Sequence, residues 1–322
     1  MAGSEGPKPS AELQHALWNM KVMGSALARQ RYAAGLAGPG LPAPALPEPV
    51  GLDSRLCRQR DVESPWLHHW CWRLGMVPIY HRKVWEDAYV VQALWEAGML
   101  APGRRGLGFA VGRESLPSLF AAEGATILAT DLHATDGRGR AWQATRQHSQ
   151  SAEMLHYPHL IGRDDFLERV RFEPVDMTRI PASLTRGQFD FLWSVCSFEH
   201  LGSIEAGIEY VLRAMACLRP GGIAVHTTEF NLVSEGPTLE AGSTVLFQRR
   251  HIESLMARLI AAGHAPAPMD FDPGGDVLDA FIDLPPFAHA DGVSAMPDAP
   301  HLRLSLGGHV ATSIGMIIRA AA

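Results

Sequence analysis

Cysteine is scarce in this sequence, and the few cysteines are widely spaced. The chain of 322 residues contains Cys57, Cys71, Cys196 and Cys217, and no two of them form a C-x-x-C pair. This pattern excludes a disulfide framework and a structural zinc site of the usual spacing. We therefore expect four reduced thiols.

Long apolar runs and an excess of basic residues are also missing. The first residues, MAGSEGPKPSAELQHALWNM, contain no apolar stretch of signal-peptide length. No apolar run approaches the roughly 18 residues that a membrane-spanning helix needs. The net charge is −6, so nucleic-acid binding has no electrostatic support. We expect a cytoplasmic protein without a membrane span or a nucleic-acid partner.

The chain does have a large apolar fraction, 47%, which is enough for a sizeable core. Two regions differ in pattern. Residues 1–100 are predicted to form a polar tail, a short helix, an Ala/Pro/Gly-rich linker over 33–51 and a helical cap or lid. Residues 101–322 are predicted to form the main domain.

The cap is predicted to contain two helices, SPWLHHWCWRLGM and HRKVWEDAYVVQALWEAGML. Most of the tryptophans lie here, and two interpretations remain open. The aromatic side chains either pack the helices onto the main domain or form a lid over a ligand, because aromatic faces stack on flat molecules and sugars. The residues concerned are Trp66, Trp70, Trp72, Tyr80 and Trp85, with His68, His69, His81 and Arg82 between them.

The main domain alternates between apolar strands and helices. This alternation predicts an α/β fold with a mostly parallel, seven-stranded sheet that has helices on both faces. The last two strands, separated by Gly-Gly, indicate a hairpin with an antiparallel last strand. Strands are predicted at 105–110, 126–131, 170–175, 189–195, 222–228, 301–306 and 309–319, helices at 113–123, 203–218 and 249–262, and a loop-rich insert at 132–169.

A glycine-rich stretch, GLGFAVG, follows the first of these strands. Glycine allows the backbone to approach a ligand closely, and the helix N-terminus beyond it favours an anionic group. Asp131 closes the next strand, where a carboxylate can accept hydrogen bonds from ribose hydroxyls. The NAD fingerprint G-x-G-x-x-G fits less well, because Val111 stands at the position of its third glycine.

Three further stretches occur in a characteristic order: FEPVDMTRI, QFDFLWSVCSFEHLG and AMACLRPGGIAVHTT. With the glycine loop, they resemble the class I S-adenosylmethionine-dependent methyltransferase family, most strongly over residues 100–230. The resemblance implies a Rossmann-like fold and S-adenosylmethionine as the cofactor.

The resemblance also implies the cofactor-binding residues. Gly108, Ala110 and Gly112 match the loop that holds the methionyl and ribose parts, and Asp131 matches the acid that binds the ribose diol. Gly106 stands where the family has an acid, and Glu114 or Glu199 is a candidate to hold the amino group instead. The remaining expected contacts are Leu132 and Met177 beside the adenine, Asp176 at its amino group, and Ser194.

Polar residues after two later strands are the candidates for catalysis. His200 is the predicted base for an acceptor hydroxyl, with Glu199 or Glu229 orienting it; alternatively, Glu199 and His200 only cap the next helix. His226 and Glu229 lie after the neighbouring strand. The four residues have the side chains for a divalent metal, but Cys196 stands where related metal-dependent enzymes have an acid, so a metal is not favoured.

The function predicted from the sequence is methyl transfer from S-adenosylmethionine to an oxygen of a small molecule, such as a sugar or a glycolipid headgroup. The alternatives are an NAD-dependent oxidoreductase, which the glycine spacing and the lack of a Y-x-x-x-K pair disfavour, and a cofactor-binding module without catalysis. The acidic segment 269–292 either walls the acceptor pocket or only connects elements. The oligomeric state is open, with a homodimer as one possibility.

Overall fold

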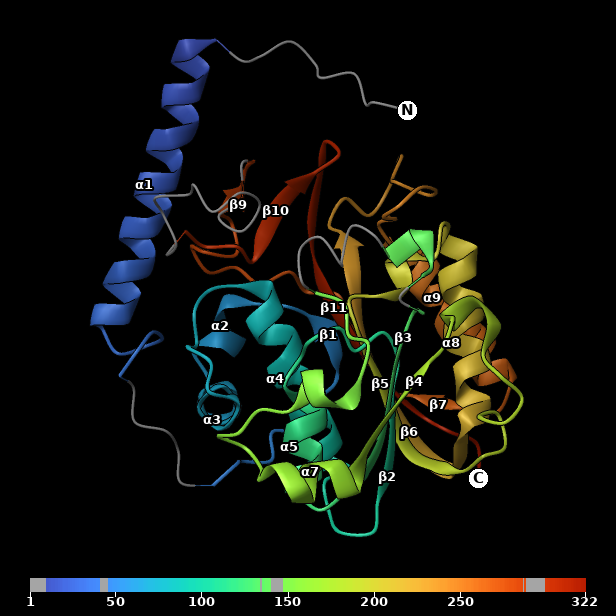
Figure 1. The fold of residues 1–322 in the computed structure, drawn as a ribbon. Helices are drawn as coiled ribbons and strands as arrows, with labels where there is room; N and C mark the ends of the chain where they lie inside the picture. The colour runs from blue at the N-terminus through green and yellow to red at the C-terminus, as the bar shows by residue number, and fades with distance from the viewer. Residues whose placement is uncertain (1–9, 41–45, 134, 140–146, 286, 288–298) are drawn as a thin grey trace.

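The computed structural model describes residues 10–40, 46–133, 135–139, 147–285, 287 and 299–322. A twisted sheet lies at the centre, with helices on both of its faces (Figure 1). The predicted polar tail and parts of the linker, of the insert and of the acidic segment lie outside the described residues.

The central sheet is mostly parallel, as predicted. Its parallel strands are arranged β4-β3-β2-β5-β6, and the antiparallel β11 lies beside β6. This arrangement confirms the predicted Rossmann-like sheet with an antiparallel last strand. The strands are β2 (Arg105–Gly108), β3 (Thr126–Asp131), β4 (Val170–Pro174), β5 (Phe189–Val195), β6 (Leu218–Asn231) and β11 (His309–Arg319).

Short strands enlarge the sheet beyond the seven that were predicted, to eleven in the described part of the chain. Strand β1 belongs to the predicted cap region, yet it pairs with β11 and β8 and so joins the main sheet. The hairpin of β10 and β11 is confirmed, with both turn glycines at positive φ. The added strands are β1 (Ser54–Leu56), β7 (Ala265–Pro266), β8 (Met269–Asp270) and β9 (Ile282–Asp283), while β10 (Arg303–Leu306) is the strand predicted at 301–306.

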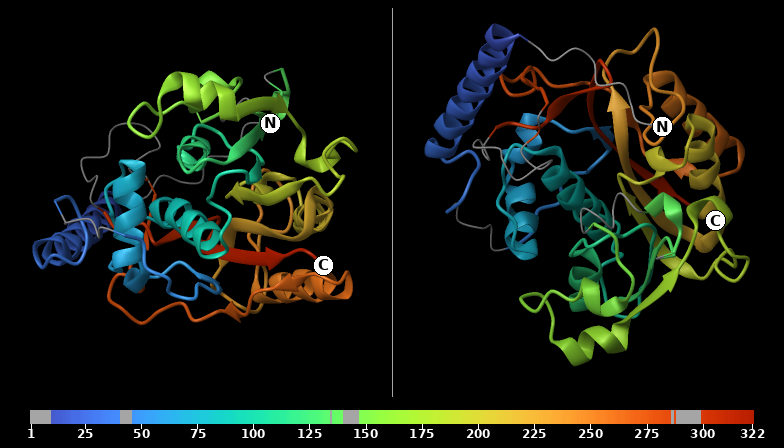
Figure 2. Two further views of the ribbon diagram at one scale, coloured as in Figure 1. Left: turned by 90° about the horizontal axis from the view of Figure 1, so that it is seen from below. Right: turned by 45° about the horizontal axis from the view of Figure 1, so that its top comes forward.

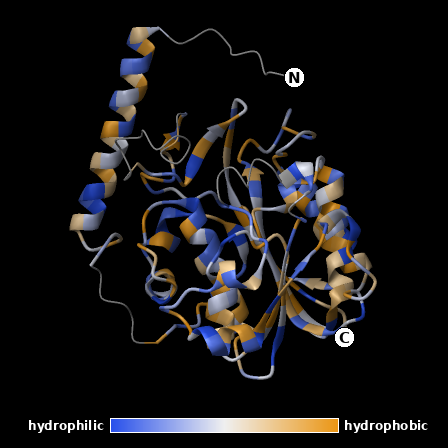
Figure 3. Ribbon diagram, viewed as in Figure 1, coloured by the Kyte–Doolittle hydropathy of each residue, from blue (hydrophilic) through white to orange (hydrophobic). Residues whose placement is uncertain are grey.

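The helices form two layers because the strands present apolar side chains to both faces. In β5, Phe191 and Trp193 face one core while Leu192 faces the other. The first layer contains α3 (Pro65–Leu74), α4 (Arg82–Glu96), α5 (Leu116–Ala122) and α7 (Arg163–Arg169), and the second contains α8 (Ile204–Ala214) and α9 (Arg249–Ala261). Figure 3 shows apolar residues along the sheet strands and on these helices.

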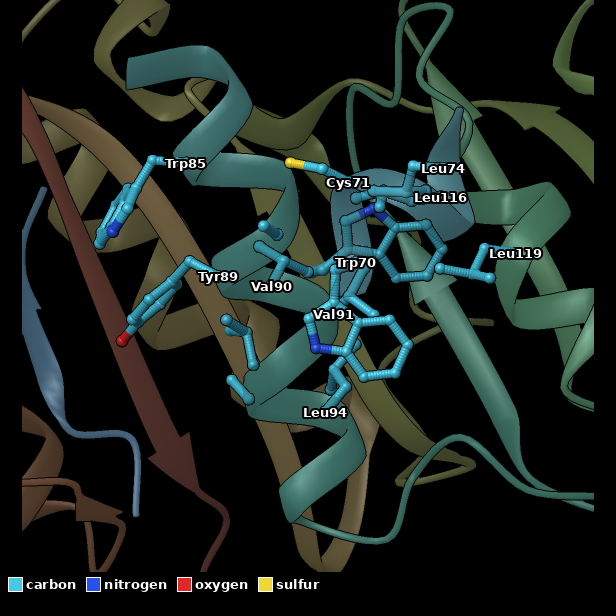
Figure 4. Packing of buried hydrophobic residues seen from close by; sticks show 14 of the residues in the cluster. Trp70, Cys71, Leu74, Trp85, Tyr89, Val90, Val91, Leu94, Leu116 and Leu119 are labelled. Atoms are coloured by element: carbon cyan, nitrogen blue, oxygen red, sulfur yellow. The ribbon is translucent and has the colours of Figure 1, made fainter. Parts of the chain in front are cut away.

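The aromatic residues of the N-terminal region pack the first layer. Trp70 and Trp85 are buried, and Figure 4 shows Trp70 close to Val91 and to Leu119 of α5. Trp66 and Tyr80 are buried as well, whereas Trp72 is 63% exposed. The buried rings therefore pack the helices onto the main domain, as the first of the two interpretations predicts. This packing fixes α4 against the sheet.

Helix α1 (Ala11–Ala33) is longer than the short helix that was predicted. It stands at one side of the molecule (Figure 2), and Lys21 attaches it through an ion pair with Asp283. Gly24 lies so close to Phe281 that a Cβ there would be 2.4 Å from the ring. No helix among the described residues combines the length and the apolar character needed to cross a membrane.

The insert 132–169 contains one helix that the sequence pattern did not reveal, α7, because only Phe166 of its seven residues is fully buried. The predicted helix at 113–123 begins later, at Leu116, since the preceding residues form a turn. The remaining elements are α2 (Gln59–Val62) and the 3₁₀ turns η1 (Gly137–Gly139), η2 (Ala152–Leu155), η3 (Met177–Arg179), η4 (Phe198–His200) and η5 (Met215–Cys217).

Candidate functional site

The strand order reverses between β2 and β5, because the chain continues to β3 on one side and to β6 on the other. Such a reversal opens a crevice at the carboxyl ends of the strands, and ligands bind there in open α/β sheets. A cavity of about 370 Å³ lies at this position. It is lined by Lys83, Asp87, Ala110, Val111, Gly112, Arg113, Glu114, Asp131, Leu132, Arg138, Gln147, His148, Val175, Asp176, Met177, Val195, Cys196, Ser197, His200 and Leu201.

The loop after β2 forms one side of the cavity. Its backbone is held by Phe109 N–H, which donates to Trp193 O at 2.9 Å, and by Val111 N–H, which donates to Thr130 O at 3.0 Å. Gly112 has φ +52, and a Cβ there would be 2.5 Å from the backbone oxygen of Gln147. Only glycine fits at this position. Ala110 has φ 49, a conformation that is unfavourable for alanine.

Gly106 and Gly108 lie within β2, and neither is among the residues that line the cavity. A Cβ at Gly106 would be 2.4 Å from the ring of Phe191, and one at Gly108 would be 2.4 Å from the ring of Trp193. These two glycines therefore make room for aromatic rings of β5. The sequence motif groups Gly106 and Gly108 with Ala110 and Gly112, but only Ala110 and Gly112 line the cavity.

Asp131 ends β3 and lines the cavity, as the motif implied. Its Oδ1 accepts from Leu132 N–H at 2.8 Å and its Oδ2 from Ser149 N–H at 3.2 Å. Burial raises the pKa of this carboxyl, and the backbone N–H groups counteract part of that effect. The two backbone bonds fix a carboxylate at the edge of the cavity, in a position to accept hydrogen bonds from a diol. Leu132 lines the cavity beside it.

Asp176 and Met177 line the cavity after β4. The Asp176 carboxylate accepts hydrogen bonds from Thr178 N–H at 2.8 Å, from Thr178 Oγ1 at 2.7 Å and from Arg138 Nη2 at 2.7 Å. Burial opposes ionisation, but the bonds from Arg138 and Thr178 prevail and lower the pKa of Asp176. Part of the capacity of Asp176 to accept hydrogen bonds is thus used by the insert.

Of the two candidates for the missing acid, Glu114 lines the cavity and Glu199 does not. Glu114 accepts a hydrogen bond from Trp193 Nε1 at 2.7 Å. Burial raises its pKa well above the usual range, and the charge of Asp87 raises it further. Glu199 is fully buried behind the cavity wall, where its Oε2 accepts from Thr228 Oγ1 at 3.0 Å.

His200 lines the cavity, and its ring orientation is fixed. Its Nδ1 lies 2.8 Å from the backbone oxygen of Ser243, which can only accept, so Nδ1 carries the proton. Nε2 is then the basic nitrogen, and it lies 3.9 Å from Glu199 Oε1. With the proton on Nδ1, Nε2 is the ring nitrogen that can accept a proton from a bound hydroxyl.

Besides Gly106, Gly108 and Glu199, three further predicted residues, Ser194, His226 and Glu229, are not part of the cavity lining. Ser194 and His226 are fully buried, and Ser194 Oγ is 2.7 Å from His226 Nδ1. Burial lowers the pKa of His226 to about 3, and its ring packs against Tyr210 and Phe198. Glu229 is bound by Arg82. Among the described residues no group of three or more His, Cys, Asp or Glu is arranged to hold a metal ion.

Sequence reasoning missed several lining residues, and two of them come from the cap region. Lys83 and Asp87 of α4 face the cavity. Their spacing of four residues places them on one helix face, which was a signal in the sequence, but only the apolar face of this helix was considered. The other missed residues are Arg113, Arg138, Gln147, His148, Cys196 and Ser197.

Helix α4 is joined to the end of β5 by a buried set of charged groups. Arg82 donates to Glu86 Oε1 at 3.1 Å and to Glu229. The thiol of Cys196 donates to Glu86 Oε1 at 3.1 Å. Cys196 has φ 40, so the chain is strained where it leaves β5; such strain is concentrated at functional sites.

No known family model matches the sequence, and no curated protein matches it. Solved structures are similar at low identity. Geranyl diphosphate methyltransferase in complex with GPP and sinefungin is 15% identical over 74% of this chain and 82% of that chain, with a TM-score of 0.43. A putative sarcosine dimethylglycine methyltransferase from Galdieria sulphuraria is 12% identical over 73% and 87%, with a TM-score of 0.39.

Phosphoethanolamine N-methyltransferase 2 from Haemonchus contortus, in complex with S-adenosyl-L-methionine, is 19% identical over 55% of this chain, with a TM-score of 0.35. The match spans only 37% of the length of that protein. The strand order, with the antiparallel β11 beside β6, gives the present chain a Rossmann-like fold.

Proposed function

We propose that this protein transfers a methyl group from S-adenosylmethionine to an oxygen of a small molecule. One observation carries the proposal: a single cavity at the strand-order reversal contains the glycine loop, the carboxylate of Asp131 and the basic nitrogen of His200. The residues proposed to hold the cofactor and the proposed proton acceptor thus line one cavity of a size suited to small ligands.

The residues present fit the cofactor. The loop at Ala110 and Gly112 leaves its cavity face without bulky side chains, and Asp131 offers its carboxylate to the ribose diol. Glu114 takes the place of the acid missing at Gly106 and receives the cofactor's ammonium group. S-adenosylmethionine supplies a methyl group activated by a positively charged sulfur.

At the acceptor, the protein has to orient a hydroxyl and remove its proton. As the acceptor oxygen forms its bond to the methyl carbon, the carbon–sulfur bond breaks and its electron pair remains on sulfur. His200 Nε2 takes the proton of the hydroxyl, while the bond from Nδ1 to Ser243 keeps the ring in place. Polar side chains at this end, including Lys83, Asp87 and Ser197, favour a hydroxyl-rich acceptor such as a sugar or a glycolipid headgroup.

An NAD-dependent oxidoreductase is the weaker alternative. In the dinucleotide fold a sixth parallel strand follows the fifth in the order 3-2-1-4-5-6. Here the antiparallel β11 lies beside β6 instead. Asp131 could bind the ribose of S-adenosylmethionine or of NAD and does not distinguish the two. The antiparallel last strand and the tight loop at Gly112 are the features that favour the methyltransferase.

Calorimetric titration with S-adenosylmethionine, S-adenosylhomocysteine and NAD, with and without magnesium or a chelator, tests the proposal. We expect micromolar binding of both adenosyl compounds, no binding of NAD and no effect of the chelator. Binding of NAD alone, or of none of the three, would refute the proposal.

A second experiment separates an enzyme from a binding module. His200→Gln keeps the ring-sized volume but removes the base, so we expect unchanged cofactor affinity and loss of methyl transfer to any acceptor found by mass spectrometry in a panel of hydroxylated compounds. Transfer at the wild-type rate by this variant would exclude His200 as the base. Cofactor binding without transfer to any acceptor would favour the module.

A further inference from the structure

Helix α4 places charged residues at one side of the cavity. Two cations, Arg82 and Lys83, and two acids, Glu86 and Asp87, lie near its start, and Lys83 and Asp87 line the cavity. The two cations are engaged by other acids: Arg82 by Glu86 and Glu229, and Lys83 by Glu86, at 3.1 Å. Among the described residues no ion pair joins either cation to Asp87, although the charge of Lys83 opposes the rise in its pKa that burial causes.

The carboxylate of Asp87 lines the cavity, and the described residues make no hydrogen bond or ion pair with it. Its charge reaches Glu114, where it adds to the rise in the pKa of Glu114 that burial causes. An unpaired carboxylate in a partly dehydrated site is costly unless a ligand supplies the positive charge.

The position of Asp87 is fixed relative to the end of β5. Its neighbour Glu86 accepts from Cys196 Sγ at 3.1 Å, and Arg82 donates to the same sulfur at 3.4 Å. Cys196, Ser197 and His200 line the cavity from that strand end. Asp87 therefore lines the cavity from a helix that is held against the strand end bearing Cys196, Ser197 and His200.

We propose that Asp87 stabilises the positive charge on the sulfur of bound S-adenosylmethionine and so makes the protein bind this cofactor more tightly than S-adenosylhomocysteine. The inference rests on the proposed function and deepens it. The two compounds share the adenosine and amino-acid groups and differ by the methyl group and its sulfonium charge. A carboxylate that acts on that charge strengthens binding of the substrate form and favours release of the product form.

The experiment measures both affinities by calorimetry at pH 8 for the wild type and for Asp87→Asn. We expect the wild type to prefer S-adenosylmethionine, and the variant to lose about tenfold in affinity for it, which corresponds to one modest charge interaction in a partly buried site. The affinity of the variant for S-adenosylhomocysteine should stay within about twofold of the wild-type value, because the sulfur of this compound carries no positive charge with which Asp87 could interact.

Two other variants make the result specific. Asp164→Asn is the same chemical change at an exposed position of α7, outside the cavity lining, and we expect it to alter neither affinity. Glu114→Gln removes a charge that acts on the ammonium group, which both compounds carry, so we expect it to weaken both equally. Melting temperatures of all three variants establish that they are folded.

The outcomes distinguish the two proposals. If the wild type binds neither adenosyl compound, the proposed function fails and this inference fails with it. If the wild type binds both, but Asp87→Asn weakens both equally or neither, the methyltransferase assignment stands and the role of Asp87 is wrong. A selective loss for S-adenosylmethionine, absent in Asp164→Asn, supports the inference.

Discussion

The two walls of the cavity are built in different ways. The wall at the strand ends consists of short-range features: the loop at Ala110 and Gly112, and the carboxylate of Asp131 held by the backbone of its neighbours. The wall at α4 consists of side chains, Lys83 and Asp87, that reach the cavity only because a distant helix docks there.

The difference lies in what fixes each wall. Backbone hydrogen bonds and parallel strand pairing fix the first. Buried ion pairs between α4 and the sheet, centred on Arg82, fix the second. In the proposed function, the strand-end wall binds the ribose of the cofactor, which does not change during methyl transfer. The α4 wall faces the sulfonium charge, which is lost when the methyl group leaves. The changes below separate the two walls, in order of decreasing effect.

The largest effect is expected for Arg82→Met, which removes the cation between α4 and the sheet. It removes the cation paired with the buried carboxylate of Glu229 and leaves Glu86 with Lys83 alone. Breaking a buried ion pair from one side costs about 3–5 kcal/mol. Urea unfolding should show a loss of this size. Arg60→Met breaks an exposed pair with Asp272 and should cost less than about 1 kcal/mol. Similar losses for both variants would contradict a structural role of the buried set.

Asp131→Ala tests the strand-end wall. The carboxylate is proposed to accept two hydrogen bonds from the ribose, and bonds to charged groups contribute about 1.5–3 kcal/mol each. Affinity for S-adenosylmethionine and S-adenosylhomocysteine should fall together by at least about 100-fold, as measured by calorimetry. Asp131→Asn should restore part of the affinity. An unchanged affinity in the alanine variant would place the ribose elsewhere.

The pH dependence of binding sharpens the contrast between the walls. Burial raises the pKa of Asp87 to about 7, the charge of Glu86 adds to the shift, and Lys83 opposes it. Glu114 and Tyr157 also face this carboxyl. Below about pH 7 the carboxyl is protonated and neutral, so the preference for S-adenosylmethionine over S-adenosylhomocysteine should increase as the pH rises through 7. The preference should not change through this range in Asp87→Asn; the same rise in that variant would assign the effect to another group.

The smallest effect is expected for Ala110→Gly. Alanine at φ 49 is strained by roughly 1–2 kcal/mol, and the greater freedom of glycine in the unfolded chain offsets about 0.4–1 kcal/mol of that. The variant should be more stable by about 0.5 kcal/mol in thermal unfolding. Ala26→Gly, in the exposed face of α1, should be destabilised by about as much as glycine costs in a helix. Destabilisation of both would contradict the strain at Ala110.

Much of the fold could be predicted because its signals are periodic. The apolar runs of β5 and β6 and the Gly-Gly turn before β11 were visible in the sequence, since each strand is buried or paired over its full length. Strands of two or three residues, such as β1 and β7, are too short to show a period. Whether β1 and β7 pair with the sheet depends on how the packing of α4 and α9 positions these short segments.

The site was predictable to the extent that it is local. Asp131 and Gly112 were found because strand, turn and helix follow one another directly. Ser194 and His226 were misplaced because alternate residues of a strand point to opposite faces, and the end of the strand could not be located to one residue. Asp87 was missed because it reaches the cavity only through the tertiary packing of α4 against the sheet.

A crystal structure of the protein with S-adenosylhomocysteine tests the central claim most directly. The account predicts that the ligand lies in the cavity between β2 and β5, with its ribose hydroxyls on Asp131 and its amino group beside Glu114. A ligand bound elsewhere, or a cavity filled by the insert with Asp131 turned away from the ligand, would contradict it.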